Sequence, residues 1–77
     1  MTPQWIHNPD VTPTPRDLEV VAVTLEGQHG SWAVAIAEFF ADCHEQRGDA
    51  GRSWAWLGVA DVVRERQLAR DMSAAET

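Results

Sequence analysis

A chain of 77 residues allows one domain, because a second hydrophobic core would need several tens of further residues. The formal charge of −6 comes from 12 Asp and Glu against six arginines and no lysine, which disfavours binding to nucleic-acid phosphates and to anionic membranes. The single cysteine, Cys43, excludes an internal disulfide, and neither a signal peptide nor a membrane-spanning run is visible. We therefore expect a soluble, cytoplasmic protein.

The chain divides into an arm, a folding unit and a tail. Residues 1–14 hold three prolines and are expected to be a flexible or loosely docked arm. Residues 15–72 carry helical patterns, and residues 73–77 form a short polar tail. The predicted fold is all-α, a compact three-helix domain with a Pro-rich N-terminal arm.

The first helix is expected near residues 15–28. Thr14 is a suitable N-cap, Pro15 suits the first helical position, and Asp17 can complete a capping box. Either Gly27 or Gly30 can end this helix.

The second helix is expected over residues 31–47, capped by Ser31 and ending at Gly48. Its apolar residues, from Trp32 to Cys43, predict a buried face. Glu38, Asp42 and Glu45 recur at helical spacing and predict an acidic face.

The third helix is expected over residues 52–70, with Gly58 marking either close approach of a neighbouring helix or a tolerant position. The spacings Asp61 to Arg64 and Gln67 to Asp71 suit pairs on the helix surface. The predicted core consists of Leu18, Val21, Leu25, Trp32, Ile36, Phe39, Phe40, Trp56, Val59 and Val63.

Several of these residues form a recognisable pattern: Glu19, Val23, His29-Gly30, Ala33, Ala37-Glu38, Gly48-Asp49, Gly51, Trp56, Val59-Ala60 and Val63. The chain resembles a family of short bacterial helical proteins, a domain of unknown function, over about residues 18–68. The most specific elements are Gly48-Asp49 followed by Trp56 and Val59-Ala60, and the His29-Gly30 turn. Trp54 departs from the family pattern, which usually has no aromatic residue there. The resemblance implies a compact helical domain and no particular activity.

Trp54 is the most informative candidate for a contact surface. Residues two apart on a helix point about 200° apart, so Trp54 and Trp56 cannot both face the core. Trp54 shares a second stripe with Leu57, Asp61, Glu65 and Leu68. Trp54 either contacts a protein, or it folds over the connection between the second and third helices or receives the N-terminal arm.

Metal binding and catalysis find little support. His29, Cys43 and His44 are the soft ligand candidates, but a structural zinc site needs four clustered ligands, and neighbours on a helix diverge. No motif for a nucleophile or for phosphate binding is present. We expect no metal, no cofactor and no enzymatic activity.

The leading functional hypothesis is a non-catalytic interaction module that binds a protein partner or a second copy. Its candidate surfaces are the Trp54, Leu57, Asp61, Leu68 stripe and the acidic face of Glu38, Asp42 and Glu45. A sharper version is a phage- or mobile-element-type inhibitor of a basic surface. The alternative is a helix-turn-helix DNA-binding regulator that uses Arg52, Arg64, Arg66 and Arg70 of the third helix.

Overall fold

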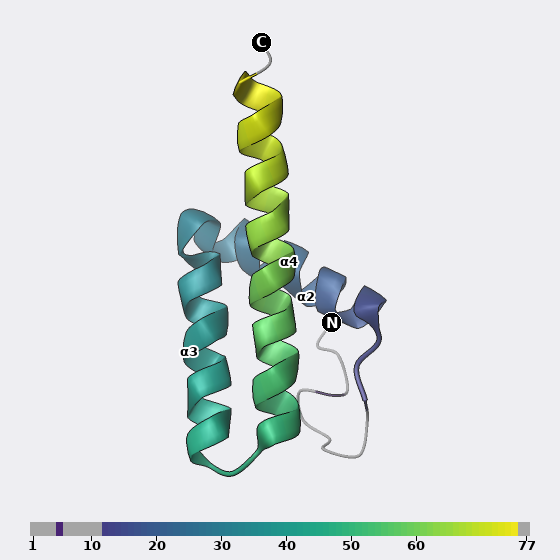
Figure 1. Ribbon diagram of the computed structural model, residues 1–77, viewed down its shortest axis with the longest axis vertical. Helices are drawn as coiled ribbons and strands as arrows, with labels where there is room; N and C mark the ends of the chain where they lie inside the picture. Colours follow the sequence, from purple (N-terminus) through teal and green to yellow (C-terminus); the bar gives the residue numbers. More distant parts are fainter. Residues whose placement is uncertain (1–4, 6–11, 76–77) are drawn as a thin grey trace.

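The computed structural model describes Trp5 and residues 12–75, which are helical apart from short connections. In chain order, α2 spans Pro15–His29, the 3-10 turn η1 spans Gly30–Trp32, α3 spans Ala33–Gln46 and α4 spans Ala50–Ala75. Figure 1 shows α3 and α4 side by side and antiparallel, with α2 crossing behind them. The all-α class is confirmed. The compact three-helix packing is found in part, because α3 and α4 form a two-helix hairpin and α2 packs mainly on α4.

The first helix begins as the capping pattern predicts. The Asp17 amide donates to Thr14 Oγ1 at 3.2 Å, and the Thr14 amide donates to Asp17 Oδ2 at 2.9 Å. The helix ends at Gly30, whose φ of +56° favours glycine, while Gly27 stays inside the helix. Local sequence therefore predicts the start of α2, and the structure selects Gly30 from the two glycines that could end it.

The entry to α3 differs from the expectation. Ser31 does not cap the helix; it lies in the turn η1, and α3 begins at Ala33 without a side-chain cap. At the other end, Gly48 adopts a φ of +80° and reverses the chain. The Arg52 amide then donates to Asp49 Oδ1 at 3.1 Å, so Asp49 caps the start of α4. This helix also runs past the predicted end at residue 70 to Ala75.

Alanines make the α3 side of the core, contrary to the prediction. Ala33, Ala37 and Ala41, spaced four residues apart, are buried, whereas Trp32 and Phe39 are 71% and 61% exposed. Phe40 is 38% exposed, although its ring contacts Trp56, so none of these three side chains is buried as predicted. The apolar residues of α3 cover too much of its circumference for spacing alone to select the buried side. Small side chains allow α4 to approach the alanine side closely, which is the physical reason for the observed orientation.

The remaining core predictions fare better. Val21, Leu25, Trp56, Val59 and Val63 are buried, and Leu18 and Ile36 pack partly buried against them. A Cβ atom built on Gly58 would lie 3.0 Å from Leu18 Cδ1, so this glycine marks the place where α2 crosses α4.

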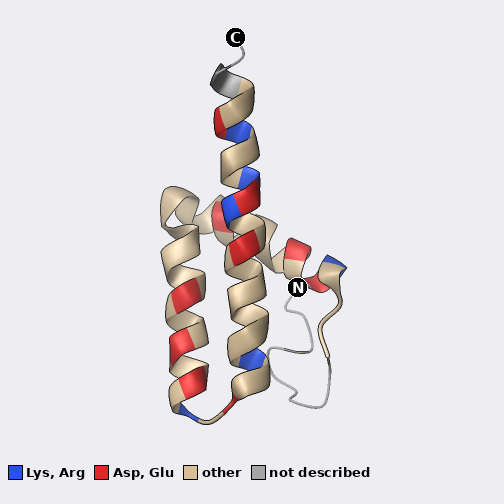
Figure 2. Ribbon diagram, in the orientation of Figure 1, with Lys and Arg blue, Asp and Glu red and all other residues tan. Residues whose placement is uncertain are grey.

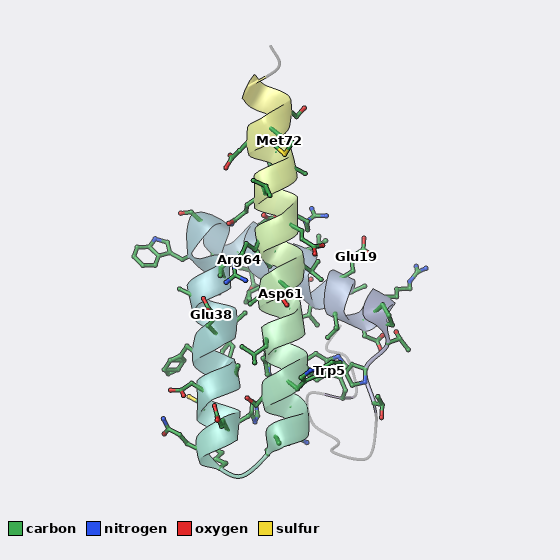
Figure 3. The ribbon with its side chains drawn as sticks, viewed as in Figure 1. Trp5, Glu19, Glu38, Asp61, Arg64 and Met72 are labelled. Carbon is green, nitrogen blue, oxygen red and sulfur yellow. The ribbon has the colours of Figure 1, made fainter. Side chains whose placement is uncertain are left out.

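Trp5 belongs to the core, although nothing in its Pro-rich surroundings predicts this. Its ring packs edge-on against Trp56 with a centroid distance of 5.6 Å (Figure 3), and Phe40 lies 4.8 Å from the Trp56 ring. Arg52 Nε donates to the Trp5 carbonyl oxygen at 3.3 Å. The rest of the predicted arm, residues 1–4 and 6–11, lies outside the described residues.

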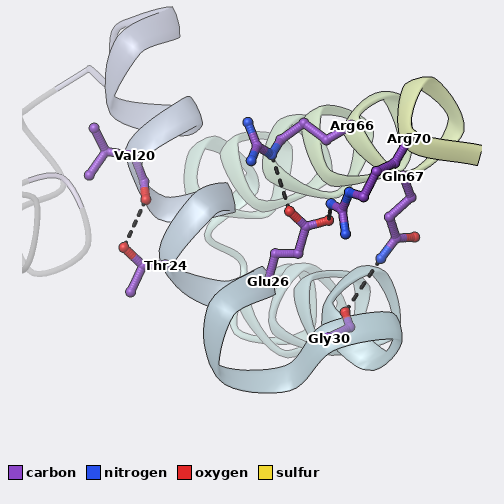
Figure 4. Close-up of polar contacts among 7 residues, drawn as sticks. All are labelled: Val20, Thr24, Glu26, Gly30, Arg66, Gln67 and Arg70. Atoms are coloured by element: carbon purple, nitrogen blue, oxygen red, sulfur yellow. Dashed lines mark hydrogen bonds and ion pairs between the residues drawn. The ribbon is translucent and has the colours of Figure 1, made fainter. Parts of the chain in front are cut away.

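A polar clamp ties α2 to the C-terminal half of α4 (Figure 4). Arg66 Nε donates to Glu26 Oε1 at 3.2 Å, Arg70 donates to Glu26 Oε2, and Gln67 Nε2 donates to the Gly30 carbonyl oxygen at 3.4 Å. The spacing of Gln67 and Asp71 predicted a pair between these two side chains. Gln67 instead donates a hydrogen bond to Gly30, at the end of α2. Burial raises the pKa of Glu26, but the hydrogen bonds and charges of Arg70 and Arg66 outweigh this effect and hold the pKa below its ordinary value.

Within residues 12–75, no helix is both long enough and apolar enough to cross a lipid bilayer.

Candidate interaction surface

The outer side of α4 carries a row of exposed apolar side chains. Trp54 is 70% exposed, whereas Trp56, two residues later, is only 7% exposed, as the 200° argument requires. Leu57, Leu68 and Met72 continue the exposed row along the helix. We call the row of Trp54, Leu57, Asp61, Glu65, Leu68 and Met72 the α4 stripe. Met72 was missed because the sequence predicted the helix to end at residue 70.

A charged pair interrupts the α4 stripe near its middle. Arg64 Nη1 donates to Asp61 Oδ1 at 3.0 Å, which confirms the predicted surface pair. Arg64 Nη2 also lies 3.6 Å from Glu38 Oε1 on α3. All three side chains are at least half exposed, so these contacts add little to the stability of the fold. They do connect the outer side of α4 to that of α3.

The acidic residues of α3 lie exposed along one side of the helix. Figure 2 shows these acidic segments, which have no lysine or arginine between them within α3. Asp42 accepts a hydrogen bond from Gln46 Nε2 at 3.2 Å, and Glu45 is exposed. We call Glu38, Asp42 and Glu45 the α3 acidic stripe.

The two stripes meet on one face of the hairpin. Figure 3 shows Glu38 of α3 and Asp61, Arg64 and Met72 of α4 on the side turned toward the viewer. The Glu38–Arg64 contact is the point at which the stripes meet. From the sequence, the α4 stripe and the α3 acidic stripe were two alternative contact surfaces. Helical spacing does not show which side of α3 packs against α4, so it could not show that the two stripes are neighbours. The structure makes them neighbouring parts of one face, which we call the hairpin face.

Trp54 also borders a small groove at the start of α4. Trp5, Pro13, Arg52 and Trp54 are among the residues that line it, and its volume is about 170 Å³. Trp5 and Pro13 of the predicted arm therefore line the same groove as Trp54. Most of the indole nevertheless stays exposed.

The arginines of α4 all lie near carboxylates. Arg52 Nη1 lies 3.2 Å from Asp49 Oδ2, Arg64 pairs with Asp61 and Glu38, and Arg66 and Arg70 both bind Glu26. These contacts neutralise the charges that a DNA-binding helix would direct at phosphates.

The candidate metal ligands do not converge. His29 ends α2, Cys43 lies half-buried on α3, and His44 Nδ1 lies 3.8 Å from Asp49 Oδ2. Trp5 and residues 12–75 contain no group of three or more His, Cys, Asp or Glu side chains placed to hold a metal ion.

A second exposed apolar area lies on η1 and α3. It contains Trp32 and Phe39, and the Phe39 and Phe40 rings pack edge to face at a centroid distance of 6.0 Å.

Comparison of the chain with protein-family models, with curated proteins and with solved structures found no match. The resemblance to short bacterial helical proteins therefore stays a prediction.

Proposed function

We propose that this protein is a non-catalytic interaction module that binds another protein through the hairpin face. The observation that carries the proposal is the exposure of Trp54, at 70%, on the helical stripe of Asp61, whose ion-pair partner Arg64 lies 3.6 Å from Glu38 of the α3 acidic stripe. Tryptophan is enriched among the residues that dominate binding energy, and protein interfaces typically combine such an anchor with a polar rim. Trp54 and Leu57 supply the anchor, and Glu38 supplies part of the rim.

A basic protein surface is the partner chemistry that fits this face best. Glu38, Asp42 and Glu45 are spread over two turns of α3, and within that helix no arginine or lysine offsets them. Such a stripe accelerates association with a basic surface and favours one orientation of binding. A nucleic-acid-binding protein in the cytoplasm offers a surface of this kind, so inhibition of its binding is the sharper form of the proposal. We also propose that the chain is a member of the family of short bacterial helical proteins that it resembles.

Position-specific photo-cross-linking in the source cell tests the proposed function. A photoreactive phenylalanine replaces Leu57 or Asp42 on the hairpin face, and in a matched control it replaces Val23, an exposed residue of α2. We expect an adduct with one basic protein from positions 57 and 42, which weakens as salt rises, and none from position 23. Equal adducts from all three positions, or none from the hairpin face, would contradict the proposal.

No observation favours the helix-turn-helix alternative. The arginines that it requires, Arg52, Arg64, Arg66 and Arg70, are each engaged by a carboxylate. We expect random duplex DNA to remain unbound at both 50 mM and 200 mM salt, conditions between which phosphate-driven binding falls by roughly three to five orders of magnitude. Tight binding at the lower salt concentration would revive the alternative.

A further inference from the structure

We propose that the basic partner binds the hairpin face with one amphipathic helix, which lies along the α4 stripe and carries its arginine or lysine residues beside its apolar ones. This inference rests on the proposed function, because it takes the hairpin face as the binding surface and a basic protein as the partner. It goes further by naming the element with which that protein binds and the order of apolar and basic groups along it.

The α4 stripe is a straight row along its helix. Its members follow one another at spacings of three, four, four, three and four residues, so the pattern repeats every 11 residues. Eleven residues complete three turns of an α-helix to within roughly 20°, and the row therefore stays on one side of α4. From Trp54 to Met72 the row extends over about 27 Å at about 1.5 Å per residue. A helix of about five turns has the same length and the same straight shape.

The hairpin face offers side chains and no sheet edge. Both of its elements, α3 and α4, are helices, whose backbone amide and carbonyl groups bond to one another along the chain. An extended peptide that adds a strand needs unpaired backbone groups at an edge, and this face supplies none within α3 and α4. A helix needs only side-chain contacts, so it is the element that this face suits.

The side of the hairpin that carries the α4 stripe has room for a further helix. Figure 1 shows α2 crossing behind α3 and α4, so the opposite side is not covered by α2. Trp54 is 70% exposed there, and Leu68 and Met72 are each 59% exposed. A partner helix on this side buries both apolar ends of the α4 stripe and places the hairpin between two helices, as in a helical bundle.

The middle of the α4 stripe requires a basic residue in the partner helix. Asp61 and Glu65 are exposed and separate the apolar pair before them from the apolar pair after them. The partner helix therefore carries apolar residues toward both ends and arginine or lysine near its centre. Arg64 pairs with Asp61 and Glu38, but its side chain is 55% exposed. A cation of the partner therefore displaces Arg64 at little cost, because exposed ion pairs contribute little.

The α3 acidic stripe makes the two ends of the partner helix different. Because α3 and α4 are antiparallel, Asp42 and Glu45 lie beside the first half of α4, and Figure 2 shows the acidic segments of α3 in that part of the view. The end of the partner helix over Trp54 therefore carries further basic residues on its α3 side. Beyond α3, Asp71 is the acid on that side of α4, seven residues after Arg64. The end over Met72 is accordingly the more apolar one.

Mapping of cross-linked residues tests the partner helix directly. The probe is the protein that position 42 captures in the source cell, and mass spectrometry locates the residue of that protein to which a photoreactive phenylalanine at position 57 or 68 attaches. Neighbouring helices cross at shallow angles and rise equally per residue, so we expect two attachment sites about three turns apart in one helical segment. Position 23 on α2 is the control and should give no attachment.

Two kinds of failure remain distinct in this experiment. The helix is wrong if the attachment sites lie in separate segments, if they are fewer than about two or more than about four turns apart, or if position 68 gives none. Capture of a basic protein by positions 42 and 57 would still uphold the proposed function. Absence of such capture would overturn the proposed function and the helix together.

A pair of charge variants tests the basic residue at the centre of the partner helix. Asp61→Asn removes a carboxylate from the middle of the α4 stripe, and Glu19→Gln removes the same charge from an exposed position on α2. With the captured protein as ligand, we expect Asp61→Asn to weaken binding by about fivefold or more and Glu19→Gln by less than about twofold. The melting temperatures of both variants should match that of the wild type. Equal effects of the two variants on binding would overturn the central ion pair with the partner helix.

Discussion

Trp5 and Trp32 place the same side chain in opposite surroundings, since Trp5 is 1% exposed and Trp32 is 71% exposed. Trp5→Ala should lower the free energy of unfolding by about 3–5 kcal/mol, because it removes a ring packed against Trp56 and leaves a cavity. Trp32→Ala should change it by no more than about 0.5 kcal/mol. Urea denaturation followed by circular dichroism measures both values. Similar losses in the two variants would show that the assignment of core and surface is wrong.

The tryptophans also show what sequence can reveal about single residues. Helical geometry places Trp54 and Trp56 on opposite sides of one helix, and the structure confirms this separation. Trp5 lies in a segment without periodicity, so no rule of spacing could place its ring against Trp56. Its role depends on a contact between residues far apart in the sequence.

At the level of the helices, two glycines allow a matched comparison. Gly27 lies in α2 with nothing within 4 Å of a Cβ atom, whereas a Cβ atom on Gly58 of α4 meets Leu18 Cδ1 at 3.0 Å. Gly27→Ala should raise the free energy of unfolding by about 0.5–1 kcal/mol through helix propensity. Gly58→Ala should gain less or lose stability, because Leu18 must shift. Thermal melts of both variants test the difference, and an equal gain would argue against close crossing of α2 and α4.

The Glu26 clamp predicts an acid-sensitive link between α2 and α4. The pKa of Glu26 is lowered in the folded protein, so its contribution is fully present above the ordinary glutamate pKa of about 4.3 and is lost as pH falls through the lowered value. Glu26→Gln should lower the melting temperature at pH 7 and flatten its decline below about pH 5. Glu19→Gln, at an exposed position on the same helix, is the control. Parallel pH profiles of wild type and Glu26→Gln would contradict the clamp.

The sequence predicts those features of the helices that depend on residues close together in the chain, and it does not predict those that depend on contacts between distant residues. The start of α2 depends on Thr14 and Asp17, three residues apart, and was predicted correctly. Which side of α3 is buried depends on how closely α4 approaches it. The sequence pattern predicted that Trp32 and Phe39 would be buried, whereas the structure buries Ala33, Ala37 and Ala41. Both ends of the Glu26 clamp lie far apart in the chain, so neither Arg66 nor Arg70 could be assigned to it from spacing.

For the whole molecule, the sequence predicts the two stripes of the candidate site but not that they lie next to each other. The α4 stripe, except Met72, and the α3 acidic stripe follow from helical periodicity. Their meeting at Glu38 and Arg64 follows from the rotation of two packed helices, which only the structure provides. That meeting is what turns two alternative surfaces into one hairpin face.

The central claim is that Trp54 serves association and not the fold. The most direct measurement is the photo-cross-link from position 42 to the basic protein partner, made in the Trp54→Glu variant beside Trp32→Glu, which places the same change at an equally exposed tryptophan outside the hairpin face. We predict that Trp54→Glu keeps the helical content and cooperative melt of the wild type but loses the adduct, because a carboxylate buried in an apolar contact costs several kcal/mol. Trp32→Glu should form the adduct as the wild type does. Unfolding of Trp54→Glu, or an adduct unchanged by it, would contradict the account.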